Sequence, residues 1–225
     1  MTAIPTKPHF EFDAGAICLN FANTVWERPG FLTPSPDAPY ELLETYADLL
    51  LWARTGAVIS DQQLRYLESE ARNDPGAAYR AYISARALRE AIFAACLHLA
   101  LQRDPNSLQL EELNERLAAS PHQKIKYHHH LSPQSIATAP VSPFTLTERS
   151  TEVNYIELIV LRDVVRLLTT APIDRLRVCA AEDCGWLFLD TSKNGKRRWC
   201  SMSDCGNRAK ANRFQSRKKV ATSAF

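Results

Sequence analysis

Apolar residues recur at intervals of three or four over most of the first 172 residues, with polar residues between them. This is the period of helices that bury one face, and it predicts a mainly α-helical body. The longest pattern runs unbroken for some 30 residues from Pro75. The predicted helices span residues 40–56, 60–74, 75–104, 107–120 and 151–172.

Local signals mark where several of these helices begin and end. Ser60 is a typical N-cap, because its hydroxyl can accept a hydrogen bond from a backbone amide of the first turn. Asp74 followed by Pro75 fits an N-cap with proline at the first helical position. Gly56 and Pro172 are predicted to end the helices that precede them.

A short β-hairpin is predicted within the helical domain, which we take as residues 1–172. Residues 124–131 and 143–148 alternate weakly between apolar and polar positions. His128–His130 lie in the first stretch and invite a metal interpretation. Successive strand residues point to opposite faces, however, so a solvated strand or loop is favoured.

Charge is distributed unevenly along the chain, although the net charge is only +2. Residues 175–219 hold 12 Lys or Arg against 4 Asp or Glu, a net of +8, and the remainder holds 15 against 21, a net of −6. A basic segment on an acidic body predicts an anionic partner. The chain has no run of roughly 18 apolar residues and no signal-peptide pattern at its start. We therefore expect a cytoplasmic protein that does not enter the membrane.

Four of the six cysteines occupy a repeated frame, C-x-x-x-D-C-G, at residues 179–185 and 200–206. Two such close pairs can supply the four thiolates that a tetrahedral zinc ion prefers, and glycine after each pair allows a tight turn. Two disulfides, or a redox switch with labile zinc, are the alternatives. Four thiolates would leave no open position for a catalytic water, so the zinc is expected to be structural. The predicted ligands are Cys179, Cys184, Cys200 and Cys205; Cys18 and Cys96 are expected in the core.

Residues 186–200, between the pairs, are predicted to form a hairpin around the turn Lys193–Lys196, because Asn-Gly is a strong hairpin signal. A basic helix follows the last cysteine. Nucleic-acid binding is the favoured interpretation, ahead of a solvated basic tail or of protein or membrane contacts. The candidate contact residues are Arg197, Arg198, Asn207, Arg208, Lys210, Arg213, Arg217 and Lys218.

The segment RLRVCAAEDCGWLFLDTSKNGKRRWCSMSDCGNRAKANRFQSRKK resembles the CGNR zinc finger, whose naming motif stands here at residues 205–208. The segment FEFDAGAICLNFANT, residues 10–24, resembles the opening of the ABATE domain, although Asn20 stands where an Asp is common in that family. The resemblance implies a bacterial, stress-related transcription regulator that binds zinc and DNA. The expected fold is mainly α: a helical domain with a short hairpin, and at residues 173–220 a small treble-clef or ribbon-like zinc finger ending in a basic helix.

The helical domain is expected to bind an effector, to form a homodimer, or both, because a regulator needs an input and symmetric half-sites favour a dimer. No enzymatic site is predicted, since the sequence holds no recognisable nucleophile–base pair or phosphate-binding glycine loop. Polar residues among apolar ones near the start of the chain could orient a ligand or, alternatively, satisfy backbone groups and fix how the segment packs. The polar residues are Asn20, Asn23 and Thr24, and the apolar Trp26 completes the possible ligand pocket.

Overall fold

The computed structural model describes residues 10–26, 40–103, 105, 107–119, 124–127, 144–147, 152–181 and 184–212. Helices dominate, as the periodicity predicts. In the described residues no helix combines the length and the apolar character that crossing a bilayer requires. The helices are α1 (Ile17–Ala22), α2 (Tyr46–Thr55), α3 (Asp61–Asn73), α4 (Pro75–Ala100), α5 (Ser107–Ala119) and α6 (Tyr155–Thr170).

Side-chain caps place the helix starts. Ser60 forms a capping box with Gln63 at the start of α3, and Asp74 accepts a hydrogen bond from the Ala77 amide, with proline at the first position of α4. These two starts agree with the sequence prediction.

The start predicted for α2 at residue 40 is wrong. Tyr40–Glu41 forms strand β2, paired antiparallel with β1 (Val25–Trp26), and the helix begins only after Thr45, which forms a capping box with Asp48. The run of apolar residues extends across the strand and the helix, so periodicity alone could not separate them.

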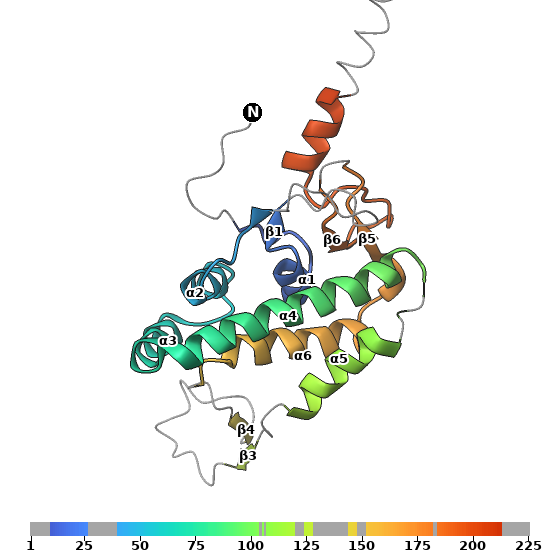
Figure 1. Ribbon diagram of the computed structural model, residues 1–225. Coiled ribbons are helices and arrows are strands. Elements are labelled where there is room, and N and C mark those ends of the chain that lie inside the picture. Colours follow the sequence, from blue (N-terminus) through green and yellow to red (C-terminus); the bar gives the residue numbers. More distant parts are fainter. Residues whose placement is uncertain are drawn as a thin grey trace, which may run out of the picture.

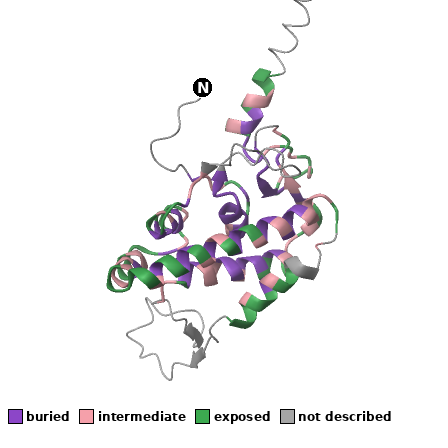
Figure 2. Ribbon diagram, viewed as in Figure 1, coloured by how far each residue is buried: buried purple, intermediate pink, exposed green. Residues whose placement is uncertain are grey.

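The core lies where α4 crosses the other helices. α4 has 26 residues, about 39 Å at 1.5 Å per residue, and it contacts α1, α2, α3, α5 and α6. Figure 1 shows α4 and α6 running side by side, with α1 against both. Buried residues gather on the facing sides of these helices (Figure 2). Phe21 of α1, Trp52 of α2 and Leu88 of α4 are among the fully buried side chains of the core.

Two further strand pairs complete the fold. β3 (Lys124–Tyr127) and β4 (Phe144–Thr147) form the predicted short antiparallel hairpin. His128–His130 lie outside the described residues. β5 (Leu176–Val178) pairs antiparallel with β6 (Leu187–Leu189), after a 3₁₀ turn, η2 (Ile173–Arg175).

The β5–β6 pairing corrects the predicted hairpin over residues 186–200. The turn exists, because the Gly195 amide donates to the Ser192 carbonyl and Gly195 has φ +61°. No second strand follows the turn in the described residues 191–199, however. The buried Asp190 carboxylate accepts from the amides of Ser192 and Arg197 and so holds this segment as a loop.

The cysteine segment packs against the helical body and shares its core. β5 contacts α4, and β6 contacts both α1 and α4. The Leu189 amide donates to the Ala14 carbonyl at 2.8 Å, and Gly15 is so close to Leu189 that an added Cβ would lie 3.3 Å from its carbonyl oxygen. The two predicted domains therefore meet in one continuous apolar cluster.

Candidate metal centre

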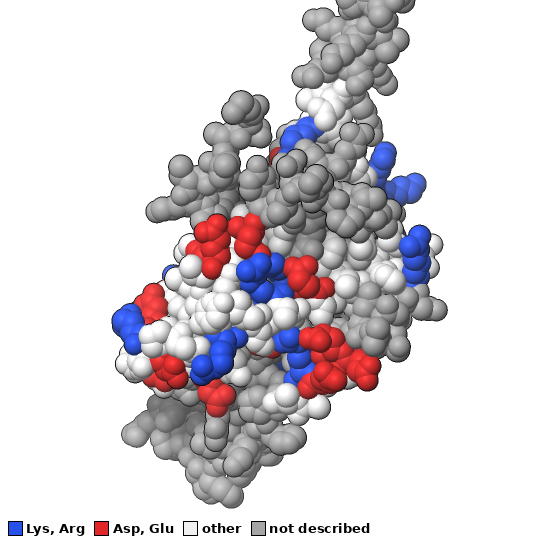
Figure 3. Space-filling view, in the orientation of Figure 1, with Lys and Arg blue, Asp and Glu red and all other residues white. Residues whose placement is uncertain are grey.

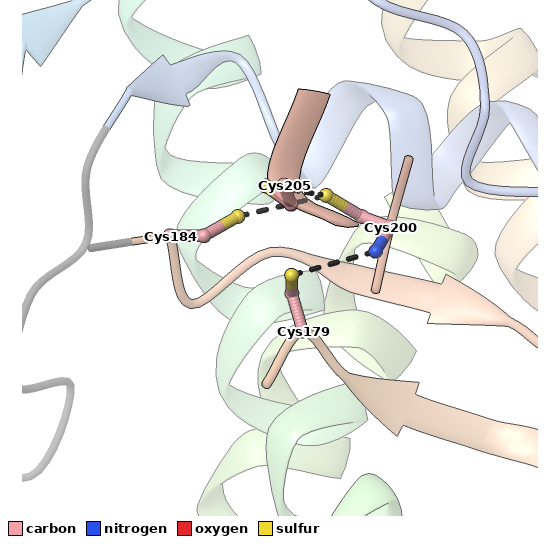
Figure 4. Close-up of side chains that lie close together, drawn as sticks. All are labelled: Cys179, Cys184, Cys200 and Cys205. Atoms are coloured by element: carbon pink, nitrogen blue, oxygen red, sulfur yellow. Dashed lines mark hydrogen bonds between the residues drawn. The ribbon is translucent and has the colours of Figure 1, made fainter. Parts of the chain in front are cut away.

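Four cysteines from two separate stretches of chain converge on one point (Figure 4). Cys179 directly follows β5 and Cys184 lies shortly before β6, so the first pair flanks the turn of that hairpin. Cys200 lies in the following loop, and Cys205 lies in η3 (Met202–Gly206), a single π-helical turn. The β5–β6 hairpin thus contributes two sulfurs, and the loop with the π-helical turn that follows it contributes the other two.

The spacing of the sulfurs fits a tetrahedral zinc ion. The Sγ atoms of Cys184 and Cys200 lie 3.6 Å apart, those of Cys200 and Cys205 lie 3.5 Å apart, and all four lie within 4.8 Å of one another. Zinc–sulfur bonds of about 2.3 Å place the sulfurs of a tetrahedron about 3.8 Å apart. All six cysteines of the chain are free thiols. The structure therefore does not contain the two disulfides that were the alternative to a metal site. These four residues would hold zinc as a structural ion with no position left for substrate.

The pKa values of the clustered thiols favour the binding of a cation. Hydrogen bonds from the neighbouring thiols, that of Cys184 foremost, lower the pKa of Cys179. Sharing protons with Cys179 raises the pKa of Cys184 and Cys200, and burial raises them further. Without a cation, protons are therefore held by Cys184 and Cys200 in preference to Cys179. A bound divalent cation takes the place of those protons, which makes metal binding pH-dependent.

The two glycines that follow the cysteine pairs serve different purposes. Gly185 has φ +70°, in the left-handed region where glycine is favoured. At Gly206 the constraint is one of space and is mild: a Cβ there would lie 2.7 Å from the Sδ of Met202, whose exposed side chain would have to shift. The sequence suggested a positive φ for both, and only the first turn has it.

Backbone and side-chain donors surround the sulfurs. The Cys200 amide lies 3.4 Å from Cys179 Sγ, and Arg208 Nη2 donates to Cys205 Sγ at 3.2 Å. N–H groups directed at thiolates spread their negative charge and fix their orientation.

The structure places the described basic residues in different settings. Arg197 faces inward: its guanidinium donates to the carbonyls of Asp13, Trp199 and Cys200 and lies 4.7 Å above the ring of Phe188. Arg198 and Lys210 are exposed, and the exposed Asn207 donates to the Ser203 carbonyl. Arg208 is half-buried against the cysteines. Arg213, Arg217 and Lys218 lie outside the described residues.

The polar residues near the start of the chain are bonded within the protein. Asn20 accepts from the Ala14 amide, and Thr24 donates to the Phe21 carbonyl. Asn23 donates to the Leu187 carbonyl at 2.8 Å and accepts from the Leu187 amide at 3.0 Å. These bonds match the alternative interpretation, in which the segment fixes packing. The side chain of Trp26 lies outside the described part of the structure.

Sequence reasoning did not anticipate that this segment holds the cysteine module. Trp186 Nε1 donates to the Val25 carbonyl at 2.8 Å, beside the Asn23–Leu187 pair. Sequence reasoning also missed Arg89, which is buried and forms two hydrogen bonds with the Glu41 carboxylate. An arginine on the apolar face of a predicted helix was the available signal.

A cavity of about 640 Å³ opens elsewhere on the helical body, among α3, α4, α5 and α6. Arg116 lies on its wall and is held by Glu112, Glu157 and the hydroxyl and carbonyl of Ser84. None of Asn20, Asn23, Thr24 and Trp26 is among its described lining residues.

Comparison with protein families accounts for nearly the whole described chain. Residues 175–218 match the CGNR zinc finger. Residues 15–171, most of the chain, match the ABATE family, described as "Putative stress-induced transcription regulator". Neither description is that of an enzyme, and a comparison with curated proteins finds no match. The family match spans the helices that carry the body, and the finger match spans all four clustered cysteines, so the chain belongs to the ABATE family and carries a CGNR zinc finger.

Proposed function

We propose that the protein is a zinc-dependent transcription regulator that binds DNA through its C-terminal finger. The observation that carries the proposal is that one short segment provides both metal ligands and the start of the basic helix. Cys205 lies two residues before the helix of residues 207–212. This helix extends away from the body (Figure 1), so a nucleic-acid backbone could approach it.

The distribution of charge supports the same assignment. Lys and Arg predominate at the finger end, whereas acidic and basic side chains are interspersed over the visible face of the body (Figure 3). A zinc ion with four thiolates carries a charge of −2, so the net of +8 for residues 175–219 becomes +6. A surface of this sign gains affinity for DNA by releasing the counterions of the phosphates.

The proposed interface keeps the candidate residues of the basic segment except two arginines, which are bonded within the protein. Arg197 is left out, because its guanidinium is bonded to carbonyl groups of the protein. Arg208 is left out as well, because its guanidinium donates to Cys205 Sγ. The remaining residues are Arg198, Asn207, Lys210, Arg213, Arg217 and Lys218.

DNA binding is tested with zinc-loaded protein and a random duplex pool, followed by affinity measurements across a salt series. Lys210→Ala should weaken binding and reduce the slope of log affinity against log salt by about 0.9, the value for one phosphate contact. Arg72→Ala, an exposed arginine on α3, is the matched control and should leave both unchanged. Salt-independent binding, or equal losses in the two variants, would contradict the proposal.

We also propose that the cavity among α3–α6, and not the segment around Asn23, is the effector site of the regulator. Its volume of about 640 Å³ falls within the range of small-molecule sites. The same cavity favours the second candidate function, a small-molecule-binding protein or enzyme whose finger is only structural. Ligand-dependent melting with no DNA affinity in any zinc-loaded sample would select that second function.

The effector site can be probed with two neighbouring tryptophan substitutions on α5. Ala119 lines the cavity and is exposed, whereas Ala118 is exposed but is not among the lining residues. In a thermal-shift screen of small organic acids and amines, Ala119→Trp should abolish any stabilisation that wild type and Ala118→Trp retain. Equal responses of the two variants would remove the cavity from consideration.

The proposed homodimer is tested separately by light scattering of the eluting protein.

A further inference from the structure

Arg208 faces back towards the metal centre and not outward from the basic helix. Its Nη2 lies 3.2 Å from Cys205 Sγ and 3.7 Å from Asp204 Oδ2. The Arg208 side chain is 33% exposed, whereas the neighbouring Lys210 lies on the surface as an exposed residue. Long side chains on a helix lean towards its N-terminus and cover the preceding turn. An arginine three residues after Cys205 is therefore positioned over that sulfur.

This placement matters because Cys205 is the ligand nearest to the basic helix. Four thiolates around zinc leave an excess charge of −2, and a guanidinium N–H directed at one of them offsets part of it. The same contact fixes the first turn of residues 207–212 to the sulfur cluster. Arg197 supports the second cysteine pair in parallel, by donating to the Trp199 and Cys200 carbonyls.

We infer that Arg208 is a positioning residue of the metal centre, which stabilises the Cys205 thiolate and orients the basic helix, and that it is not a DNA contact. The sequence pattern had grouped Arg208 with the nucleic-acid contacts on charge alone. The role of Arg208 at the metal centre requires only the metal site, so this part of the inference is tested independently of DNA binding. It divides the basic residues by role: Arg208 serves the metal, and Lys210, two positions later, remains in the proposed DNA interface.

The test compares Arg208→Ala, Arg208→Lys and Arg208→Gln with Lys210→Ala in the full chain. Zinc release to a colorimetric chelator is followed over time, and the thiolate-to-cobalt charge-transfer band is recorded after substitution with Co²⁺. Arg208→Ala should release zinc about 10-fold faster or more, the usual scale for loss of a group that orients a metal ligand. It should also shift the cobalt band. Arg208→Lys should recover part of the effect, and Lys210→Ala should behave as wild type.

DNA binding of the zinc-saturated variants gives the second readout. Arg208→Ala should keep the wild-type dependence of affinity on salt, whereas Lys210→Ala should not. The inference is overturned if zinc release and the cobalt band of Arg208→Ala match wild type, or if its salt dependence falls as that of Lys210→Ala does. Should Arg208→Ala not fold, Arg208→Lys and Arg208→Gln decide by the same measurements. If no variant binds DNA, the proposed function fails while the metal readouts still decide the role of Arg208.

Discussion

At the scale of single residues, the six buried cysteines have two different chemistries, because their surroundings differ. The four clustered thiols have one another as neighbours and favour a metal. Cys18 and Cys96 instead lie in the apolar core, where burial raises the pKa of Cys18 well above its usual range and that of Cys96 to about 12. Asp163, itself buried, accepts a hydrogen bond from the Cys18 amide at 2.8 Å and pairs with Arg166. Both core thiols therefore stay protonated and unreactive at neutral pH.

The raised pKa of Cys96 predicts a loss of stability in alkaline solution. The pKa of a cysteine thiol in an unfolded chain is about 8.5, whereas burial raises the pKa of Cys96 in the folded chain to about 12. The stabilising contribution is complete below the unfolded pKa. It is lost as the pH rises towards the folded pKa, because the unfolded chain releases a proton that the folded chain keeps. The free energy of unfolding, measured by urea titration, should fall less steeply above pH ~8.5 in Cys96→Ala than in wild type, by at most about 1.4 kcal/mol per pH unit. Parallel curves would show that folded Cys96 releases its proton at the same pH as the unfolded chain, so that burial does not raise its pKa.

At the scale of elements, the sequence predicts those features that depend on residues close together in the chain. Ser60 and Asp74 each cap an amide three residues away, so the starts of α3 and α4 can be read from a short window. The partner of β6 could not be predicted in this way. The Asn-Gly signal favoured the following segment, but hydrogen bonding by Asp190 and burial against α1 and α4 select β5.

The same limit applies to the candidate site. The repeated cysteine frame identified all four clustered thiols, because their spacing is local in each pair. The inward orientation of Arg197 was not predictable, because one of its acceptors, the Asp13 carbonyl, is 184 positions away. Charge patterning distinguishes basic segments from acidic ones, but it does not show which guanidinium groups are already bonded inside the protein.

The contact between α1 and β6 depends on the two hydrogen bonds between Asn23 and Leu187. Asn23→Ala would leave the Leu187 amide and carbonyl unpaired in the interior, at about 1–3 kcal/mol for each group. We expect a total loss of about 2–6 kcal/mol in the free energy of unfolding, measured by urea denaturation of zinc-loaded protein. The exposed Asn73→Ala, at the end of α3, is the control and should change it by less than about 0.5 kcal/mol. A similarly small change in both variants would mean that water replaces the Asn23 bonds.

At the scale of the whole molecule, the finger and the body are joined by more than the chain that links them. Polar contacts to Ala14, Asn23 and Val25 lie beside an apolar cluster that includes both Leu187 and the helices of the body. A small zinc module depends on its metal for much of its folding free energy, on the order of 10 kcal/mol. Because the finger supplies part of the core of the body, loss of the metal should be felt beyond the finger.

Removal of zinc should therefore loosen a defined part of the body. After chelation under reducing conditions, hydrogen exchange measured by mass spectrometry should accelerate at residues 176–189, where the metal holds the hairpin. It should also accelerate at residues 14–25, whose partners are Leu187, Trp186 and Leu189. α3 is the internal control, because its main contacts are with α2 and α4, and it should keep its protection. Cys200→Ser should reproduce the pattern without a chelator. Faster exchange confined to residues 173–212 would instead mean that the predicted boundary at residue 172 separates two units that fold independently, and that zinc occupancy is not communicated to the helical body.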